Sequence, residues 1–213
     1  MMKRKIPCFC DNTFTVEVPE EIDLDLRPLY IDEILDGSFM TFTCASCGKK
    51  HKPEFPLTVL WPSHSIRFEV LPELERGEFY RRKKDPPFSA KSPIEKIETI
   101  IGYPELADRI AVLRDGLEPH VIEGLKYFVL LKADESYPEE EISIWYQNRG
   151  PDGLEFHIHG LKQDEVAVTR LPLALYEKTL EDYKRHPKEE PFVSLQVRSY
   201  LSVQNMMRGE ESK

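Results

Sequence analysis

The spacing of apolar residues along this chain changes several times, and the first third has mainly the period of strands. Apolar and polar residues alternate over residues 14–18 and 66–70, which predicts half-buried strands, and residues 38–43 predict another. Between them, Pro28 precedes an apolar stripe at helical spacing that ends at Gly37. Proline is favoured at helix starts and glycine at helix ends, so this stripe predicts a short inserted helix. We expect a small antiparallel sheet with a helical insert.

In the second half of the chain the period becomes that of helices. Three apolar stripes, punctuated by proline and glycine, predict helices over residues 93–102, 104–116 and 119–134. The first of these stripes is preceded by a capping box made by Ser92 and Glu95, a frequent start of a helix.

After these stripes the period changes to two, which predicts a meander of three strands. The strand segments are residues 141–148, 154–161 and 165–171. A helix is predicted over residues 172–186, and the last apolar stretch, residues 192–207, fits either a helix or a strand.

The composition suggests where the domains divide. Residues 73–92 are rich in charge and proline, with RRKKDPP at their centre, which is typical of a linker. We therefore predict an α+β protein with an antiparallel β unit over residues 1–72, a linker over 73–92 and an α+β domain over 93–208.

Four cysteines in two close pairs give the first third its candidate chemistry. They are Cys8, Cys10, Cys44 and Cys47, in the motifs CFC and CASCG, and the chain has no others. Zinc takes four soft ligands in a tetrahedron, and each tight turn can supply two of them. Gly48 can adopt the positive φ that such a turn needs, and Asp11 and Asn12 stand in its place after the first pair. The pattern predicts a zinc-ribbon-like unit with a structural Zn²⁺.

Other interpretations of the cysteines stay open. Disulfides are disfavoured because a bridge between Cys8 and Cys10 would be strained and the N-terminus has no apolar signal segment. A thioredoxin-like redox pair would need a strand-to-helix context, and CASC lies between predicted strands. Unpaired buried thiols also remain, and His51 could replace one cysteine as a ligand.

The charge of the chain bears on its partners. Six basic residues flank the cysteines: Lys3, Arg4, Lys5, Lys49, Lys50 and Lys52. They could compensate the negative charge of a thiolate site or form a solvated rim, and both interpretations stay open. The net charge of the whole chain is −9, which opposes binding to nucleic acid, so we expect a protein partner.

The remaining composition is that of an ordinary soluble protein. The chain has 213 residues, 40% of them hydrophobic and 31% charged, which is enough to bury a core. Its longest apolar run, Tyr127 to Leu131, is too short to cross a bilayer, so we expect no membrane partner and a cytoplasmic location.

A second constellation could carry chemistry on a predicted strand. Glu155, His157 and His159 share one face by the period of two, and two imidazoles with a carboxylate can hold a catalytic metal. A solvent-facing strand surface is the simpler interpretation. The sequence has no nucleophile elbow, phosphate-binding glycine loop or dinucleotide fingerprint, so an enzyme is not indicated.

The paired cysteines, the stretch from FTVEVPEE to KPEFPL and the segment DGLEPHVIEGLKYFVLL together resemble the CpXC family, a bacterial and archaeal group with two short cysteine motifs. The resemblance implies that Cys8, Cys10, Cys44 and Cys47 match the family's four cysteines. The chain departs from the pattern because neither pair contains a proline and the first pair is one residue shorter. No biochemical activity is assigned to this family, so the resemblance supports the fold and the metal only.

These observations favour a non-enzymatic, zinc-stabilised binding or adaptor protein. Two alternatives remain at this point. One is a metal-dependent hydrolase that uses Glu155, His157 and His159. The other is a nucleic-acid-associated protein that uses the basic rim and the cluster at Arg81.

Overall fold

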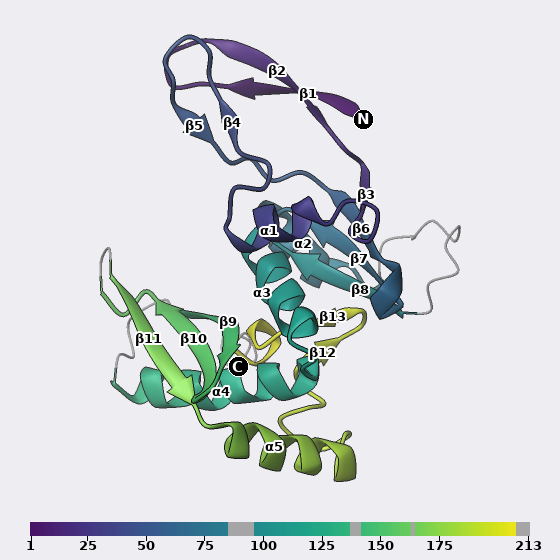
Figure 1. Cartoon of the computed structure of the whole chain (residues 1–213), viewed down its shortest axis with the longest axis vertical. Coiled ribbons are helices and arrows are strands. Elements are labelled where there is room, and N and C mark those ends of the chain that lie inside the picture. Colours follow the sequence, from purple (N-terminus) through teal and green to yellow (C-terminus); the bar gives the residue numbers. More distant parts are fainter. Residues whose placement is uncertain (85–95, 137–141, 163–164, 208–213) are drawn as a thin grey trace. The chain divides into compact units, whose positions relative to one another are not determined.

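The computed structural model in Figure 1 describes residues 1–84, 96–136, 142–162 and 165–207. The fold is α+β, as predicted. The chain forms two compact units, Met1–Ala107 and Asp108–Lys213, and the division falls inside one helix. The predicted linker at residues 73–92 stays a prediction, and its residues 85–92 lie outside the described ranges.

Two antiparallel hairpins form the N-terminal part of the first unit, and Figure 1 shows them side by side. The first joins β1 (Met2–Pro7) to β2 (Thr13–Val18), with Met2 opposite Val18. The second joins β4 (Phe42–Thr43) to β5 (Lys50–His51). We call this pair the cysteine hairpins, because each of their two turns carries two cysteines. The alternation in β2 confirms the strand predicted there.

The main sheet of the first unit mixes parallel and antiparallel pairs. Its strands β3 (Glu21–Asp23), β6 (Leu57–Trp61), β7 (Ile66–Leu71) and β8 (Lys96–Ile101) lie in the order β8-β7-β6-β3. The β6–β7 pair is antiparallel, whereas β3–β6 and β7–β8 are parallel. The prediction of a single small antiparallel sheet is therefore wrong for this part of the chain, although the hairpins themselves are antiparallel.

The helix predicted over residues 93–102 is wrong, because residues Lys96–Ile101 form β8. Consecutive residues from Glu98 to Ile101 are buried on both faces of the strand, so the period of two is lost and the apolar spacing imitates a helix. Ile97, Thr99, Ile100 and Ile101 are β-branched, which favours a strand. The capping-box residues Ser92 and Glu95 lie outside the described residues.

Short helices complete the first unit. The insert forms α1 (Leu29–Leu35) with Pro28 at its N-cap, as predicted. A 3₁₀ turn at Pro62–His64 joins β6 to β7, and another at Glu73–Glu75 leads into α2 (Arg76–Arg81). Phe79 of α2 is buried, and Arg76 pairs with Glu105 at 2.8 Å. The charge of this segment therefore belongs in part to ion pairs of the folded unit.

Helices α3 (Tyr103–Arg114), α4 (Pro119–Ser136) and α5 (Leu173–Arg185) confirm the three other helix predictions. The predicted meander is also confirmed. Its strands are β9 (Ser143–Gly150), β10 (Gly153–His159) and β11 (Val166–Leu171), with β10 in the middle. In the second unit α4 packs against β9 and α5.

The ambiguous C-terminal stretch contains both kinds of element. It forms a short hairpin of β12 (Gln196–Val197) and β13 (Tyr200–Leu201), followed by α6 (Gln204–Met207). Arg198 has a φ of 56° in the hairpin turn. Because each strand has only two residues, the stretch is too short for either period to dominate.

A cluster of four buried charged side chains links α3 to α4 in the second unit. Asp108, Arg109, Glu123 and Lys126 are each at most 4% exposed. The Lys126 ammonium lies 2.6 Å from Oδ2 of Asp108 and 2.8 Å from Oε1 of Glu123. Both carboxylates also accept backbone N–H groups, Asp108 from Tyr146 and Glu123 from Val203. The cluster therefore connects both helices to β9 and to the C-terminal segment.

Burial and the neighbouring charges act against each other in this cluster. Burial raises the pKa of Asp108 above its usual range. Burial also acts to raise the pKa of Glu123, but Lys126 and Arg109 outweigh it and hold that pKa below its usual value. Burial alone would lower the pKa of Lys126, yet the two carboxylates raise it, so the lysine stays charged.

In the described part of the chain, no helix combines the length and the apolar character needed to span a bilayer.

We expect Lys126→Met to destabilise the second unit by about 3–5 kcal/mol, because Asp108 and Glu123 would lose their shared cation while buried. Without that cation the pKa of Asp108, already raised by burial, rises further, and the pKa of Glu123 also rises. The loss of stability is therefore largest at neutral pH and shrinks as falling pH protonates the two carboxylates. Thermal unfolding followed by circular dichroism from neutral to acidic pH measures this effect. Lys178→Met, on the exposed face of α5, is the control. Equal stability of the two variants at neutral pH would contradict the expectation.

Candidate metal centre

The first cysteine pair lies in the turn between β1 and β2. The backbone N–H of Cys8 donates to the carbonyl of Asn12 at 2.8 Å, and the N–H of Asp11 donates to the carbonyl of Cys8 at 3.0 Å. Asp11 has a φ of 62°, a left-handed conformation that aspartate tolerates better than most residues. Asp11 therefore takes the place of the glycine that the sequence lacks here.

The second pair lies in the turn between β4 and β5 and has the same construction. The N–H of Cys44 donates to the carbonyl of Lys49 at 2.9 Å, and the N–H of Gly48 donates to the carbonyl of Cys44 at 2.8 Å. Gly48 has a φ of 72°, as predicted. In both turns the residue just after the second cysteine has positive φ, so the chain reverses and both sulfurs of a turn can face the other hairpin.

All four predicted cysteines lie together and could bind a metal ion. The Sγ atoms of Cys8 and Cys47 are 3.5 Å apart, those of Cys10 and Cys44 are 3.8 Å apart, and all four lie within 4.8 Å of one another. With a Zn–S distance of about 2.3 Å, a regular tetrahedron has S–S edges of about 3.8 Å. The cysteines are unbonded to one another, so the disulfide interpretation has no support.

Hydrogen-bond donors surround the sulfurs. The Cys8 sulfur accepts the N–H of Cys10, and the Cys44 sulfur accepts the N–H groups of Ser46 and Cys47. The side-chain amide of Asn12 also donates to Cys44, with an N–S distance of 3.7 Å. Donors of this kind favour the thiolate form, which is the form that binds metals.

His51 lies beside the cluster and outside the four-sulfur group. Its Nε2 is 3.1 Å from the Cys8 sulfur, and its ring stacks on Phe9 and meets the edge of Phe14. His51 is thus placed to orient Cys8, while four sulfurs already complete a tetrahedral set.

The sulfurs differ in their protonation when no metal is bound. The N–H of Cys10 acts to lower the pKa of Cys8, but burial and the three neighbouring thiols raise it to about 12. Burial acts to raise the pKa of Cys44, but the amides of Ser46, Cys47 and Asn12 lower it to about 6. Four thiols this close share their protons, and a divalent cation would replace those protons.

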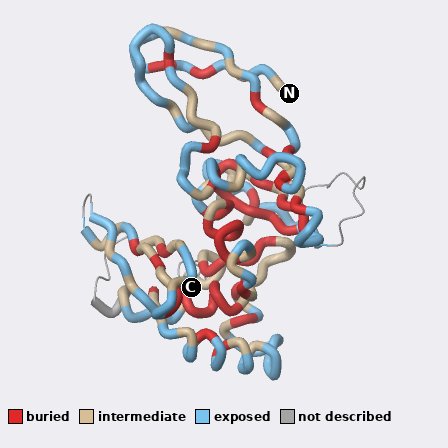
Figure 2. Tube along the Cα trace, in the orientation of Figure 1, coloured by how far each residue is buried: buried red, intermediate tan, exposed pale blue. Residues whose placement is uncertain are grey.

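The cysteine hairpins have almost no apolar core of their own, and Figure 2 shows them as mostly exposed or intermediate. The buried residues within residues 1–18 and 41–52 are Ile6, Cys8, Val18 and Cys44. Each turn supplies one buried and one exposed cysteine. The sulfur cluster is therefore a large part of what lies inside the hairpins.

The basic residues around the cluster lie at its rim. Lys49 lies over the Phe9 ring, with Nζ 5.9 Å from the ring centroid, and Arg4 lies over Phe55. Lys52 donates to the carbonyl of Gly37 at 2.6 Å. Arg4 and Lys52 therefore contact residues outside the cysteine hairpins.

The second predicted constellation does not form a metal site. Oε2 of Glu155 accepts two hydrogen bonds from Arg170, and Nε2 of His157 lies 3.4 Å from Oε1 of Glu155. Among the described residues, the cysteine cluster is the group in which three or more potential ligands lie close enough to hold an ion. Glu155, His157 and His159 are not part of it. Their shared strand face is the outer, partly exposed face of β10, opposite Phe156 and Ile158.

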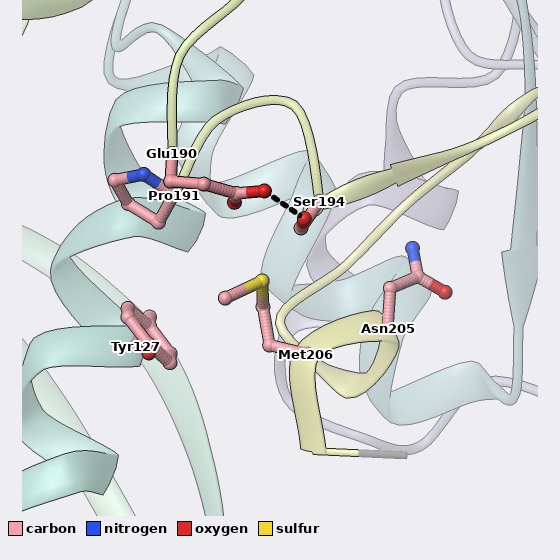
Figure 3. Close-up of a pocket in the computed structure, with 6 residues that line it drawn as sticks. All are labelled: Tyr127, Glu190, Pro191, Ser194, Asn205 and Met206. Atoms are coloured by element: carbon pink, nitrogen blue, oxygen red, sulfur yellow. Dashed lines mark hydrogen bonds between the residues drawn. The ribbon is translucent and has the colours of Figure 1, made fainter. Parts of the chain in front are cut away.

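A pocket of about 440 Å³ lies in the second unit (Figure 3). Its lining residues are Tyr127, Glu190, Pro191, Ser194, Asn205 and Met206. Ser194 donates to Glu190 at 2.6 Å, and Asn205 donates to the carbonyls of Leu195 and Tyr200. These polar side chains hold the C-terminal segment, and we assign the pocket no chemistry.

The turn geometry predicts how substitutions after each pair affect metal binding. Gly48→Ala should weaken binding about fivefold or more, because alanine at this φ costs about 1–2 kcal/mol. A Cβ at Gly48 would meet no atom within 4 Å, so backbone strain alone should act. Asp11→Gly should bind as well as the native chain or better. Competition with a chromophoric chelator measures both affinities, and unchanged binding by Gly48→Ala would contradict this account of the turn.

Comparisons with known proteins give a family match and an uncharacterised relative. A family model described as "CpXC protein" matches residues 6–126. An uncharacterised protein of Treponema pallidum (strain Nichols) is 27% identical over 215 residues, an alignment that covers 95% of this chain and 97% of the relative. No solved structure matches the chain. The family match covers more than half of the 213 residues and includes both turns that bring the four sulfurs together, so the chain belongs to the CpXC protein family.

Proposed function

We propose that this protein is a non-enzymatic binding protein whose cysteine hairpins are held together by one structural Zn²⁺. The observation that carries the proposal is the sulfur geometry, with S–S distances of 3.5 and 3.8 Å between cysteines of different hairpins. These distances are close to the edge of a zinc tetrathiolate tetrahedron.

The ligand set supports a structural role for the ion. Catalytic zinc sites keep one position open for water or substrate, whereas Cys8, Cys10, Cys44 and Cys47 would fill all four positions of a tetrahedron. The amide donors to Cys8 and Cys44 give the sulfurs a surrounding shell that stabilises thiolates. Reduced thiols persist in the cytoplasm, so the proposal includes that location.

Binding is the role that fits such a site. A metal that links two short hairpins fixes the shape of their surface, and a fixed surface loses less entropy when it meets a partner. For the surface outside the cysteine hairpins we propose a protein partner, because the residues there carry a large excess of acidic side chains.

Metal content tests the identity of the ion. A tetrahedral S₄ site suits zinc or iron, and an iron tetrathiolate would colour the protein through charge-transfer absorption. We expect one equivalent of zinc in the purified protein, measured by elemental analysis, and none in Cys47→Ser. A coloured protein with one iron would overturn the choice of zinc, and a protein that binds neither metal after reconstitution would overturn the metal centre.

Metal removal tests the structural role. A structural zinc contributes on the order of 10 kcal/mol to the folding of a small unit, and the cysteine hairpins bury few other side chains. Chelation or Cys47→Ser should therefore abolish hydrogen-exchange protection in β1, β2, β4 and β5, while α4 and α5 keep theirs. Ser46→Ala, in the same turn, is the control. Hairpins that stay protected after chelation would contradict the proposal.

A further inference from the structure

The tip of the cysteine hairpins presents an exposed aromatic ring beside basic groups. Phe9, between Cys8 and Cys10, is 88% exposed. The ammonium of Lys49 lies 5.9 Å from its centroid, and the His51 ring lies 6.1 Å away at an interplanar angle of 23°. Because the ring remains so accessible beside these two neighbours, it can stack on a further flat group.

Two lysines, Lys3 and Lys5, lie on the outer face of β1. Lys3 and Lys5 are exposed and alternate with the less exposed Met2, Arg4 and Ile6, so both lysines lie on the outward side of this strand. Residues two apart on a strand are about 7 Å apart, which is close to the spacing of successive phosphates in an extended nucleic acid strand. Lys5 faces the uncharged Thr15 across the hairpin, whereas Lys3 faces the exposed Glu17, which weakens the attraction of Lys3 for phosphate.

Charge is distributed unevenly along the chain. Residues 1–18 and 41–52 contain six Lys or Arg and two acidic residues, Asp11 and Glu17, whereas the rest of the chain contains 23 Lys or Arg and 36 Asp or Glu. A zinc tetrathiolate would add about −2 and leave the hairpins positive. The net charge of −9 is therefore the sum of +4 on the cysteine hairpins and −13 on the rest of the chain.

We infer that the tip and outer face of the cysteine hairpins bind single-stranded nucleic acid, with one base stacked on Phe9 and phosphates beside Lys3, Lys5 and Lys49. An exposed aromatic ring with neighbouring cations is the combination that binds single strands without sequence preference. A duplex hides the faces of its bases, so the ring selects a single strand.

The inference rests on the proposed metal centre. Phe9 lies between two ligands in the chain, so coordination of Cys8 and Cys10 fixes its backbone, and His51 contacts both Cys8 and the Phe9 ring. Metal removal should therefore abolish the stacking contribution and leave only weak charge attraction.

Fluorescence anisotropy with labelled oligo(dT) and oligo(U) of about 15 nucleotides tests the inference, since one module covers about 4–16 nucleotides. We expect the zinc-loaded protein to bind both oligonucleotides at low salt and a duplex of equal length more weakly. Phe9→Ala should weaken binding about tenfold, whereas Phe9→Tyr, which keeps the ring, should bind as the native chain does. Replacing Lys5 by alanine should reduce the slope of log K against log salt by about 0.7, and replacing Lys3 should reduce it by less, because Glu17 lies opposite Lys3.

Matched variants separate the tip from other surfaces. Leu74→Ala removes another highly exposed apolar side chain, and Lys178→Ala removes an exposed lysine of α5, so both should bind oligo(dT) as the native chain does. A polyglutamate peptide of similar charge should compete poorly, because it has no base to stack. Equal competition by polyglutamate, or equal binding by Phe9→Ala and the native chain, would overturn the inference.

Zinc content and hairpin protection, measured on the same samples, separate this inference from the proposed function. A zinc-loaded, protected protein that binds neither oligonucleotide at low salt would overturn the nucleic acid site and leave the metal centre standing. A protein without zinc affinity would overturn the metal centre. If that protein still bound oligo(dT) through Phe9, the link between metal and stacking would be wrong.

Discussion

The N-terminal part of this protein depends on the approach of four sulfurs from two turns that are more than thirty residues apart in the sequence. Two short hairpins with a handful of buried side chains gain too little from the hydrophobic effect to offset the entropy of ordering them. The positive φ values of Asp11 and Gly48 reverse the chain in each turn, which lets the sulfurs of the two hairpins face one another. A cation at the centre of the sulfurs would supply the missing free energy.

The second unit is held together differently. Its helices and meander bury a continuous set of apolar side chains, and inside this set lies a compact group of two acids and two bases. A buried charged group of this kind adds little stability compared with apolar side chains of the same size, but few packing arrangements satisfy all of its ion pairs. Each carboxylate also accepts a backbone N–H from another segment, so the charges specify how α3, α4, β9 and the C-terminal segment meet.

The sequence alone predicted the parts in which a local rule acts without competition. The helix after Pro28, the helices at residues 104–116 and 119–134 and the meander all follow from period, proline and glycine, and the cysteine spacing indicated which sulfurs gather. It failed at residues 96–101, where burial on both faces removed the period of the strand. At Glu155, His157 and His159 the simpler interpretation, a partly exposed strand surface, agrees with the structure. The sequence could not show that Arg170 already engages the Glu155 carboxylate, because strand period gives the face of a residue and not its partners. The buried charges Asp108 and Lys126 interrupt apolar stripes, a signal that could have indicated them.

The near absence of an apolar core in the cysteine hairpins has a consequence for how this protein can evolve. In most folds a change of surface residues is limited by the core beneath, since many positions serve both. Here the four cysteine ligands and the two turn residues with positive φ, Asp11 and Gly48, would determine the fold of the hairpins. The outward residues of β1, β2 and both turns can therefore be exchanged with little loss of stability. Recognition could thus diverge rapidly among relatives that share the same scaffold.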